Sequence, residues 1–412
     1  MTSRLEDLIA ELCPNGVEYK KIKDVYLRIK GTPITASKMK EIASEDGEVR
    51  IFAGGKTVIN AHESDIPKAN ITRVPAVLVQ SRGVIDAVYY DKPFTFKNEM
   101  WAYTSDSQIS VKFLYYLLKN NIQYFRDTAS GMGSLPQISL HVTEDFEIPV
   151  PPLEVQAEIV QILDTFTELT AELTAELTAE LTARKKQYEY YRDTLLTFDD
   201  NNPLHSLISC YCPNGVEYKK IGDIASIDRG GNLQKKDFCE HGIPCIHYGQ
   251  IYTKYGLFAS KSYTFIDSEC ASKQKFAHKN NIVMAVTSEN IEDVCKCVAW
   301  FGEEDAAVSG HSAIIRHNQN AKYLVYYFHS SMFFLQKRKL AHGTKVIEIT
   351  PSDLLNVTIP VPPLEVQNQI VQILDRFDAL CNDLTQGLPA EIEARRKQYE
   401  YYRDQLLTFK RA

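Results

Sequence analysis

The chain has 412 residues, a mass of 46.8 kDa and a formal net charge of -7, and this length predicts two or three domains rather than one compact core. Hydrophobic residues make up 44% and charged residues 24%, which excludes a wholly disordered chain. No apolar run reaches the roughly 18 residues that a membrane span needs. An acidic pair, Glu6 and Asp7, stands where a signal peptide would be apolar, so we expect a cytoplasmic protein without membrane association.

The cysteines point to the same compartment. The chain has nine, an odd number with no Cys-x-x-Cys pair, which argues against a zinc ribbon and a disulfide framework. We therefore expect buried free thiols in a reducing cytoplasm. Cys239, His241, Cys245 and His247 form a loose cluster whose spacing fits no known metal site, so we expect no metal.

The most informative feature is an internal duplication. Three segments occur twice: 13–22 as 212–221, 148–166 as 359–377, and 183–198 as 394–409. A period this long excludes a solenoid and indicates a duplicated two-part unit. The predicted domains are a globular domain, a helical region, a second globular domain and a second helical region: 1–147, 148–202, 203–358 and 359–412.

Each globular domain is expected to mix helices and strands. The predicted strands are 75–80, 84–90, 282–287 and 313–315, and the predicted helices are 111–118 and 323–328. The aromatic residues of those helices are expected in the core rather than as platforms for stacked bases. The fold class is therefore α+β, with two mixed α/β domains.

Between and after these domains the spacing predicts two long helices. Pro151 and Pro152 end an extended stretch, and proline is tolerated where a helix begins. An apolar stripe follows in each copy at steps of three and four residues: Phe166, Leu169, Leu173, Leu177 and Leu181, then Phe377, Leu380, Leu384, Leu388 and Ile392.

The matched stripes favour two helices packed antiparallel, related by a pseudo-twofold duplication. At about 1.5 Å per residue, the helix from about 153 to 197 would be roughly 65 Å long. Gly387 and Pro389 predict a kink in the second helix. The alternative is a solvated single helix, because a four-residue step drifts about 40° around the axis per repeat.

The acidic charge is concentrated in the helical regions. Region 148–202 has 4 basic against 11 acidic residues, whereas domain 1–147 has 18 against 19 and domain 203–358 has 17 against 15. A DNA-facing surface on the globular domains is therefore compatible with the net charge.

The sequence contains no catalytic signature that we recognise. It has no phosphate-binding Gly-x-x-x-x-Gly-Lys-Ser/Thr loop, no His-Glu-x-x-His, and no Asn/Asp-Pro-Pro-aromatic run typical of base methyltransferases. We therefore name no catalytic residue and interpret the chain as a binding protein.

The duplicated Pro-Pro-Leu-Glu-Val-Gln segment, each copy preceded by a variable domain and followed by a long helix, resembles the specificity subunit of type I restriction-modification enzymes. The tandem Thr-Ala-Glu-Leu units look like the IC branch of that family. The resemblance implies two target-recognition domains, each reading one half of a split double-stranded DNA site. It also implies docking of two methyltransferase subunits and of restriction subunits, so that S-adenosylmethionine, ATP and Mg belong to the partners and no cofactor to this chain.

Loops that differ between the copies are candidates for reading bases, because shared residues serve the fold or common partners. Glutamine suits adenine, arginine suits guanine, and glutamate accepts from cytosine. The candidates are Gln80, Ser81, Arg82, Gly133, Ser134, Gln137, Arg229, His247, Gln250, Ser288, Glu289 and Lys345. An ordinary turn or surface role is the alternative for each of them.

Residues of the shared helical segment are candidates for helix packing or partner docking. Besides the two stripes, they are Leu153, Ile159, Leu364 and Ile370. Two rival functions stay open at this point: a self-sufficient DNA methyltransferase with an unrecognised motif, and a coiled-coil scaffold without a DNA role.

Overall fold

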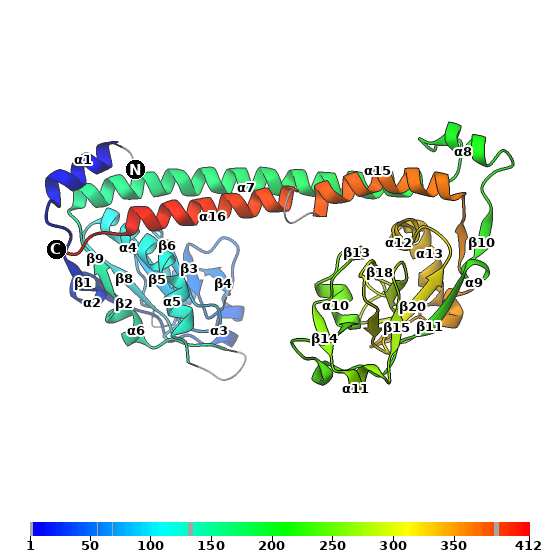
Figure 1. The fold of residues 1–412 in the computed structure, drawn as a ribbon. Helices are drawn as coiled ribbons and strands as arrows, with labels where there is room; N and C mark the ends of the chain where they lie inside the picture. The colour runs from blue at the N-terminus through cyan, green and yellow to red at the C-terminus, as the bar shows by residue number, and fades with distance from the viewer. Residues whose placement is uncertain (1–2, 56, 68, 131–134, 383–386) are drawn as a thin grey trace. The chain divides into compact units, whose positions relative to one another are not determined.

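The computed structural model describes residues 3–55, 57–67, 69–130, 135–382 and 387–412 (Figure 1). The chain divides into two compact units, residues 1–176 with 392–412 and residues 177–391. Each unit therefore contains one globular domain together with parts of two helical regions. The predicted candidates Gly133, Ser134 and Leu384 lie outside the described residues.

The globular domain of the first unit contains two sheets. The larger is antiparallel, with strand order β2 (Leu27–Lys30), β8 (Trp101–Thr104), β5 (Ala76–Gln80), β6 (Asp86–Tyr90). The smaller has the order β4 (Val58–Ala61), β3 (Val49–Phe52), β7 (Phe94–Phe96), and β3 and β7 run parallel. Helix α4 (Gln108–Asn120) packs on β5 and β6 through buried Val111, Phe113 and Leu114.

The globular domain of the second unit repeats this plan. Its five-stranded sheet has the order β11 (Ala225–Arg229), β20 (Ser312–His317), β16 (Ile282–Ala285), β18 (Cys297–Trp300), β13 (Phe258–Ala259). Its other sheet has the order β14 (Thr264–Ile266), β12 (Ile243–Ile246), β19 (Ala306–Val308), β15 (Lys275–Ala277), and β12 and β19 run parallel. Helix α12 (Ala321–Phe328) takes the place of α4, and Tyr323 and Tyr326 lie in the core as predicted.

The remaining elements are short. In the first unit they are α1 (Ser3–Leu12), β1 (Tyr19–Lys21), α2 (Ile22–Val25), α3 (Ala36–Glu41), η1 (Glu63–Asp65), α5 (Ile122–Asp127), α6 (Leu140–Glu144) and β9 (Glu147–Pro149). In the second they are α8 (His205–Tyr211), β10 (Tyr218–Lys220), α9 (Ile221–Ile224), η2 (Lys235–Asp237), α10 (Tyr248–Thr253), α11 (Ser268–Ala271), β17 (Thr287–Ser288), α13 (Ser331–Leu340), β21 (Ile347–Glu348), α14 (Pro351–Leu354) and β22 (Thr358–Pro360).

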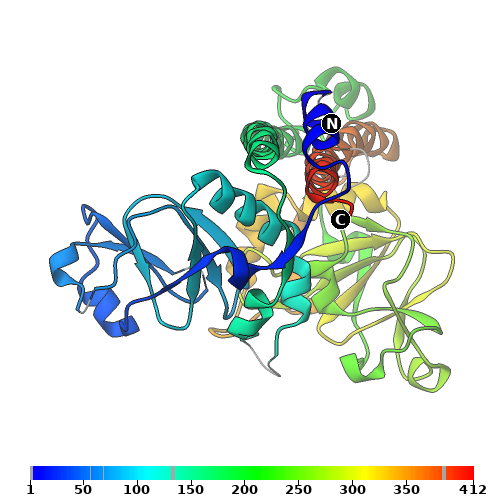
Figure 2. The same cartoon turned by 90° about the vertical axis from the view of Figure 1, so that its left-hand side faces the viewer.

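The repeated sequence segments pair with one another inside each unit. Strand β1 is antiparallel to β9, with Lys20 opposite Ile148, and β10 is antiparallel to β22, with Lys219 opposite Ile359. The segment after α1 also lies beside the last residues of the chain, and Val17 N donates to Lys410 O at 2.8 Å (Figure 2). The shared segments therefore build the fold of each unit.

The helical regions form one continuous and one interrupted helix. Helix α7 (Leu153–Leu195) has 43 residues, which corresponds to about 65 Å as predicted. In the second copy α15 (Leu364–Asn382) ends before α16 (Leu388–Leu407) begins. Gly387 stands directly before α16 and Pro389 is its second residue, so the predicted irregularity coincides with this helix end.

In each unit α7 packs antiparallel against a helix of the second copy. In the first unit Phe166 contacts Tyr402 and Thr167 Oγ1 lies 2.9 Å from Tyr399 Oη, so the partner number falls as the α7 number rises. In the second unit Tyr191 stacks on Phe377, with ring centroids 5.1 Å apart.

Four of the residues predicted for helix packing or partner docking differ sharply in burial. Leu169 and Leu380 are 55% and 40% exposed, which is compatible with partner docking but not with a fully packed helix face. Ile159 and Ile370 are fully buried in the cores of their own globular domains, so they anchor the helices to those domains and are inaccessible to a partner.

The cysteines follow the prediction in part. All nine are free, and Cys13, Cys245, Cys295, Cys297 and Cys381 are buried. Cys210 and Cys239 are exposed, contrary to expectation, because they lie at the end of α8 and in a surface turn. Among the described residues, no helix is long and apolar enough to cross a membrane, and no group of His, Cys, Asp or Glu is arranged to hold a metal.

Candidate nucleic-acid interface

Three loops of the second globular domain line an open cavity of about 630 Å³. They follow β11, β12 and β19, at the end where the parallel strands β12 and β19 both finish. The lining residues are Arg229, Gly230, Gly231, Asn232, Leu233, Gln234, Lys235, His247, Tyr248, Gly310 and His311. The cavity is therefore rich in hydrogen-bond donors and carries two cationic side chains and three aromatic rings.

Two glycines fix the first of these loops. A Cβ on Gly230 would lie 2.3 Å from the carbonyl oxygen of Ser309, so no larger residue fits there. Gly231 N donates to Val308 O at 2.8 Å, which ties the turn after β11 to the end of β19. The glycine pair thus places Arg229 at the edge of the cavity.

Arg229 is held by two contacts. Its Nε donates to Gly310 O at 2.7 Å, and its Nη1 forms an ion pair with Glu348 Oε1 at 2.7 Å. The two side chains are 43% and 38% exposed, so the pair faces solvent. A planar guanidinium anchored on one edge keeps its other donors in a fixed direction.

The aromatic part of the cavity consists of three neighbouring rings that are tilted against one another. Tyr248 lies between His247 and His311, with ring centroids 4.6 and 4.9 Å away. His247 Nδ1 accepts from Gly249 N at 3.2 Å. Desolvation, and secondarily the charges of Lys235 and His311, lowers the pKa of His247, which favours its neutral form at neutral pH.

The first globular domain builds the corresponding loops. A Cβ on Gly31 would lie 2.2 Å from Phe96 O, so Gly31 corresponds to Gly230 of the second domain. Thr32 N donates to Phe96 O at 2.7 Å, so Thr32 corresponds to Gly231. The residue before the glycine at this place is Lys30 in one domain and Arg229 in the other.

A second correspondence lies after the central strands β5 and β16. Ile138 N donates to Ser81 O at 3.0 Å, and Ile349 N donates to Val286 O at 3.0 Å. Gln137 pairs with Arg82 in the first domain, and Glu348 pairs with Thr287 in the second. Gln137 and Glu348 are therefore at equivalent positions. The framework is common to both domains, but the side chains at these two places differ.

The structure brings some predicted residues to this interface and withdraws others. Arg82, Gln137, Arg229, Glu289 and Lys345 are exposed and Ser288 is half-buried. Gln80, Ser81 and Gln250 are buried, which contradicts their prediction as base contacts. Ser81 Oγ donates to Glu99 O, and Gln250 Oε1 accepts from Thr264 Oγ1 and His247 N, so these side chains support the loops. His247 is also buried, although it lines the cavity.

Sequence reasoning missed Tyr248, His311 and Glu348. Glu348 could have been found from the sequence, because it stands 211 residues after the candidate Gln137, and this is the offset between the repeated helical segments. His311 and Tyr248 had none, since their proximity depends on the pairing of β12 with β19.

A duplicated contact fixes each domain to its own helix. In the first unit Asp164 of α7 accepts from Tyr116 Oη at 2.6 Å and pairs with Lys112 Nζ at 2.6 Å. In the second unit Asp375 of α15 accepts from Tyr326 Oη at 2.7 Å and pairs with Lys322 Nζ at 2.6 Å. Desolvation, followed by the hydrogen bond to the carboxylate, raises the pKa of both tyrosines.

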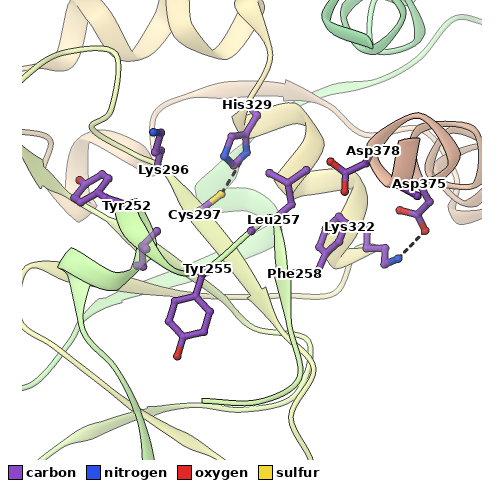
Figure 3. Close-up of a pocket in the computed structure, with 13 residues that line it drawn as sticks. Tyr252, Tyr255, Leu257, Phe258, Lys296, Cys297, Lys322, His329, Asp375 and Asp378 are labelled. Carbon is purple, nitrogen blue, oxygen red and sulfur yellow. Dashed lines mark hydrogen bonds and ion pairs between the residues drawn. The ribbon is translucent and has the colours of Figure 1, made fainter. Parts of the chain in front are cut away.

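The contact of the second unit borders another cavity, of about 650 Å³ (Figure 3). Tyr252 and Tyr255 lie on one side and Asp375 and Asp378 on the other, and Lys322 Nζ lies 4.7 Å from the centre of the Phe258 ring. His329 Nδ1 donates to Val325 O at 2.8 Å and lies 3.9 Å from Cys297 Sγ. Desolvation lowers the pKa of His329 to about 4.

Equivalent apolar residues are exposed on the helices of both units. Leu153 and Leu364 are 45% and 48% exposed, and Tyr190 and Tyr401 are exposed as well. Leu153 and Leu364 therefore do not pack between helices, and of their two predicted roles only partner docking fits.

The sequence matches the family described as type I restriction modification DNA specificity domain twice, over residues 14–183 and 213–394. The chain belongs to this family. Two curated specificity subunits are similar to it: that of EcoR124I/EcoR124II from Escherichia coli is 35% identical over 74% of this chain and 72% of its own, and the putative subunit S.HindORF215P from Haemophilus influenzae is 32% identical over 77% of each.

The fold of this specificity subunit agrees with that of solved relatives. A chain solved in a study of complex assembly and conformational transition of the type I R-M system aligns with a TM-score of 0.61 at 18% identity, over 96% of this chain and 98% of its own. This likeness confirms the predicted α+β fold class, and membership in the family identifies a non-catalytic specificity subunit.

Proposed function

We propose that the two globular domains each read one half of a bipartite double-stranded DNA site. As a family member, the chain acts in a type I complex with DNA and other subunits. The observation that carries the proposal is the shared loop framework with different side chains, Lys30 and Gln137 in one domain against Arg229 and Glu348 in the other. Equal frameworks suit equal backbone geometry of DNA, and unequal side chains suit unequal base sequences.

The proposal includes the partners. Two methyltransferase subunits dock on the two equivalent helical surfaces, one marked by Leu153 and Tyr401 and the other by Leu364 and Tyr190. Restriction subunits join this complex. S-adenosylmethionine, ATP and Mg act in those partners, and the complex works in the cytoplasm, where its DNA lies. The equal exposure of the paired residues supports two copies of one partner.

Methylome sequencing tests the DNA-reading role. A host that expresses the chain with its methyltransferase subunit should carry methylated bases in one bipartite motif, and a host with either protein alone should carry none. A motif without two separated halves would contradict the proposal. Methyl transfer by the purified chain alone would instead favour the self-sufficient methyltransferase, which the family membership does not support.

Native mass spectrometry tests the docking surfaces. Because Leu153 and Leu364 are exposed, the double change Leu153→Asp/Leu364→Asp should leave the chain folded and abolish binding of the methyltransferase subunit. Leu27→Asp is the matched control, since Leu27 is 67% exposed on β2. An unchanged mass of the double-variant complex would exclude this surface.

A further inference from the structure

We propose that Arg229 and Glu348 together read one G·C base pair of the half-site bound by the second domain. The inference rests on the proposed function and assigns it a base pair. Arg229 donates to guanine while Glu348 accepts from the paired cytosine. The two side chains meet at 2.7 Å beside the cavity of about 630 Å³ that the three loops line.

The order of hydrogen-bonding groups matches a G·C pair best, because guanine offers a second acceptor to the guanidinium. In the major groove G·C presents two acceptors, guanine N7 and O6, followed by one donor, cytosine N4. The Arg229–Glu348 pair presents guanidinium donors followed by a carboxylate acceptor. A T·A pair presents thymine O4 and adenine N6 to one guanidinium donor and the carboxylate, but the second guanidinium donor then faces the thymine methyl group instead of an acceptor.

The spacing of the pair agrees with this order. Guanine O6 and cytosine N4 are joined by a hydrogen bond of about 2.9 Å. Arg229 Nη1 and Glu348 Oε1 are 2.7 Å apart, so one donor and one acceptor of the protein face two base atoms at nearly the same separation. The bond from Arg229 Nε to Gly310 O keeps the guanidinium in this position.

A phosphate contact fits Arg229 less well. The carboxylate of Glu348 neutralises the guanidinium and would lie close to a bound phosphate, where two negative charges repel. Lys235 lines the same cavity, has no ion pair among the residues that the structure describes, and suits the DNA backbone better. The Arg229–Glu348 pair is also too exposed to contribute much to folding, so its variants should fold.

The first domain supports a reading role for this place. It has Lys30 and Gln137 at the equivalent positions, and glutamine is suited to adenine rather than cytosine. Glu348→Gln therefore gives the second domain the residue that the first domain uses. The change conserves size, removes the negative charge that pairs with Arg229, and replaces one acceptor oxygen by an amide donor.

The experiment uses the complex of the full chain with its methyltransferase subunit. Methylome sequencing first identifies the half-site that Arg82→Ala leaves unchanged. A set of duplexes then carries each of the four base pairs at every position of this half-site. The affinity for each duplex is measured for the normal chain, Arg229→Ala and Glu348→Gln. Asp228→Asn is the matched control, since it breaks the neighbouring Asp228–Arg316 ion pair in the same domain.

Both test variants should lose discrimination at one and the same G·C position, by roughly five- to 150-fold. The double variant should lose no more than either single variant, because the two residues act on one base pair. The control and the other half-site should keep their preferences, and the complex mass should be unchanged.

Three results would overturn the inference. Equal weakening on every duplex, with a smaller salt dependence, would assign Arg229 to a phosphate. Losses at two different positions would mean that the residues read separately, and unchanged discrimination would mean that they read nothing. In all three cases the proposed function would stand if the normal complex still shows a bipartite motif; absence of that motif would refute the proposed function itself.

Discussion

Phe166 of the first helical region packs on Tyr402 of the second, with ring centroids 6.1 Å apart. The same contact recurs with the copies exchanged, because Phe377 of the second region stacks on Tyr191 of the first at 5.1 Å. Both tyrosines belong to the repeated Gln-Tyr-Glu-Tyr-Tyr segment. Each unit is therefore held by an aromatic pair with one residue from each copy.

This exchange explains why the repeated segments stay alike while the domains differ. A change in one copy of the Phe or Tyr position alters only one of the two contacts, so the helices of the two units would no longer be equivalent. The β1–β9 and β10–β22 pairs differ in this respect, since each joins two segments of the same copy.

The first prediction concerns the contact between each domain and its helix. Asp164→Ala leaves the Tyr116 hydroxyl and the Lys112 ammonium without their partner, which should lower the stability of the first unit by about 1–3 kcal/mol. Asp375→Ala should have the same effect on the second unit, through Tyr326 and Lys322.

Tryptophan fluorescence during urea unfolding separates the two units. The chain has two tryptophans, Trp101 in the first domain and Trp300 in the second. In a Trp300→Phe background, where only Trp101 reports, Asp164→Ala should lower the urea midpoint and Asp375→Ala should leave it unchanged. In a Trp101→Phe background, where only Trp300 reports, Asp375→Ala should lower the midpoint and Asp164→Ala should leave it unchanged. Equal shifts in both backgrounds would mean that the aspartates stabilise both units jointly.

The sequence was sufficient to predict the architecture because the evidence was local. The repeats fixed the order of domains and helices, and the spacing of Phe166, Leu173 and Leu177 indicated the packed face of α7. The same spacing did not predict the exposure of Leu169, which lies on the stripe between half-buried Phe166 and Leu173.

The recognition loops were only partly predictable. The sequence placed Arg82 and Arg229 on turns, which the structure leaves accessible. It could not separate them from Ser81 and Gln250, because whether a polar residue beside a strand faces solvent depends on which loops cover it. The partner of Arg229 was missed for the same reason: Glu348 is 119 residues away and reaches it only through the folded sheet.

The second prediction is that readout is modular. Arg82 is exposed in the first domain, beside Gln137, so Arg82→Ala should weaken discrimination at one half-site by about 1–3 kcal/mol and leave the other unchanged. Methylome sequencing gives both half-sites in one experiment. Arg28→Ala serves as the control, because Arg28 pairs with Glu144 in the same domain. Equal relaxation at both half-sites would exclude a base contact by Arg82.

The third prediction is acid sensitivity of the second domain. The pKa of His329 is about 4 in the folded chain and about 6.5 when unfolded, so between these values only the unfolded chain takes up a proton. Above pH 6.5 the ring is neutral in both states and has no effect. Between pH 7 and pH 5 the folded state should therefore lose about 2 kcal/mol.

His329→Asn should remove this loss. In the Trp101→Phe background, the drop in stability from pH 7 to pH 5 should be about 2 kcal/mol smaller for His329→Asn than for the parent chain. Comparison of the two slopes cancels all other titrating groups. Equal slopes would show that His329 becomes protonated as readily in the folded state as in the unfolded state.

The last prediction concerns the Thr-Ala-Glu-Leu units of α7. Deletion of residues 174–177 shortens α7 by about 6 Å and turns its downstream part by about 40°. Because the following unit has the same sequence, Thr178 to Leu181 take the vacated places and the helix face upstream keeps its residues.

We expect the non-specific spacer between the half-sites to shorten by one base pair. Base pairs rise about 3.4 Å, so 6 Å corresponds to slightly under two pairs for a helix parallel to DNA. Tilt of the helix and the unshortened partner segment 378–393 absorb part of this length. Both half-site sequences should stay as they are, since no residue of either globular domain changes. Methylome sequencing of a host with the deletion measures the spacer, and insertion of one further unit after Leu177 should lengthen it by one base pair. An unaltered spacer together with altered half-site bases would show that these units do not set the distance.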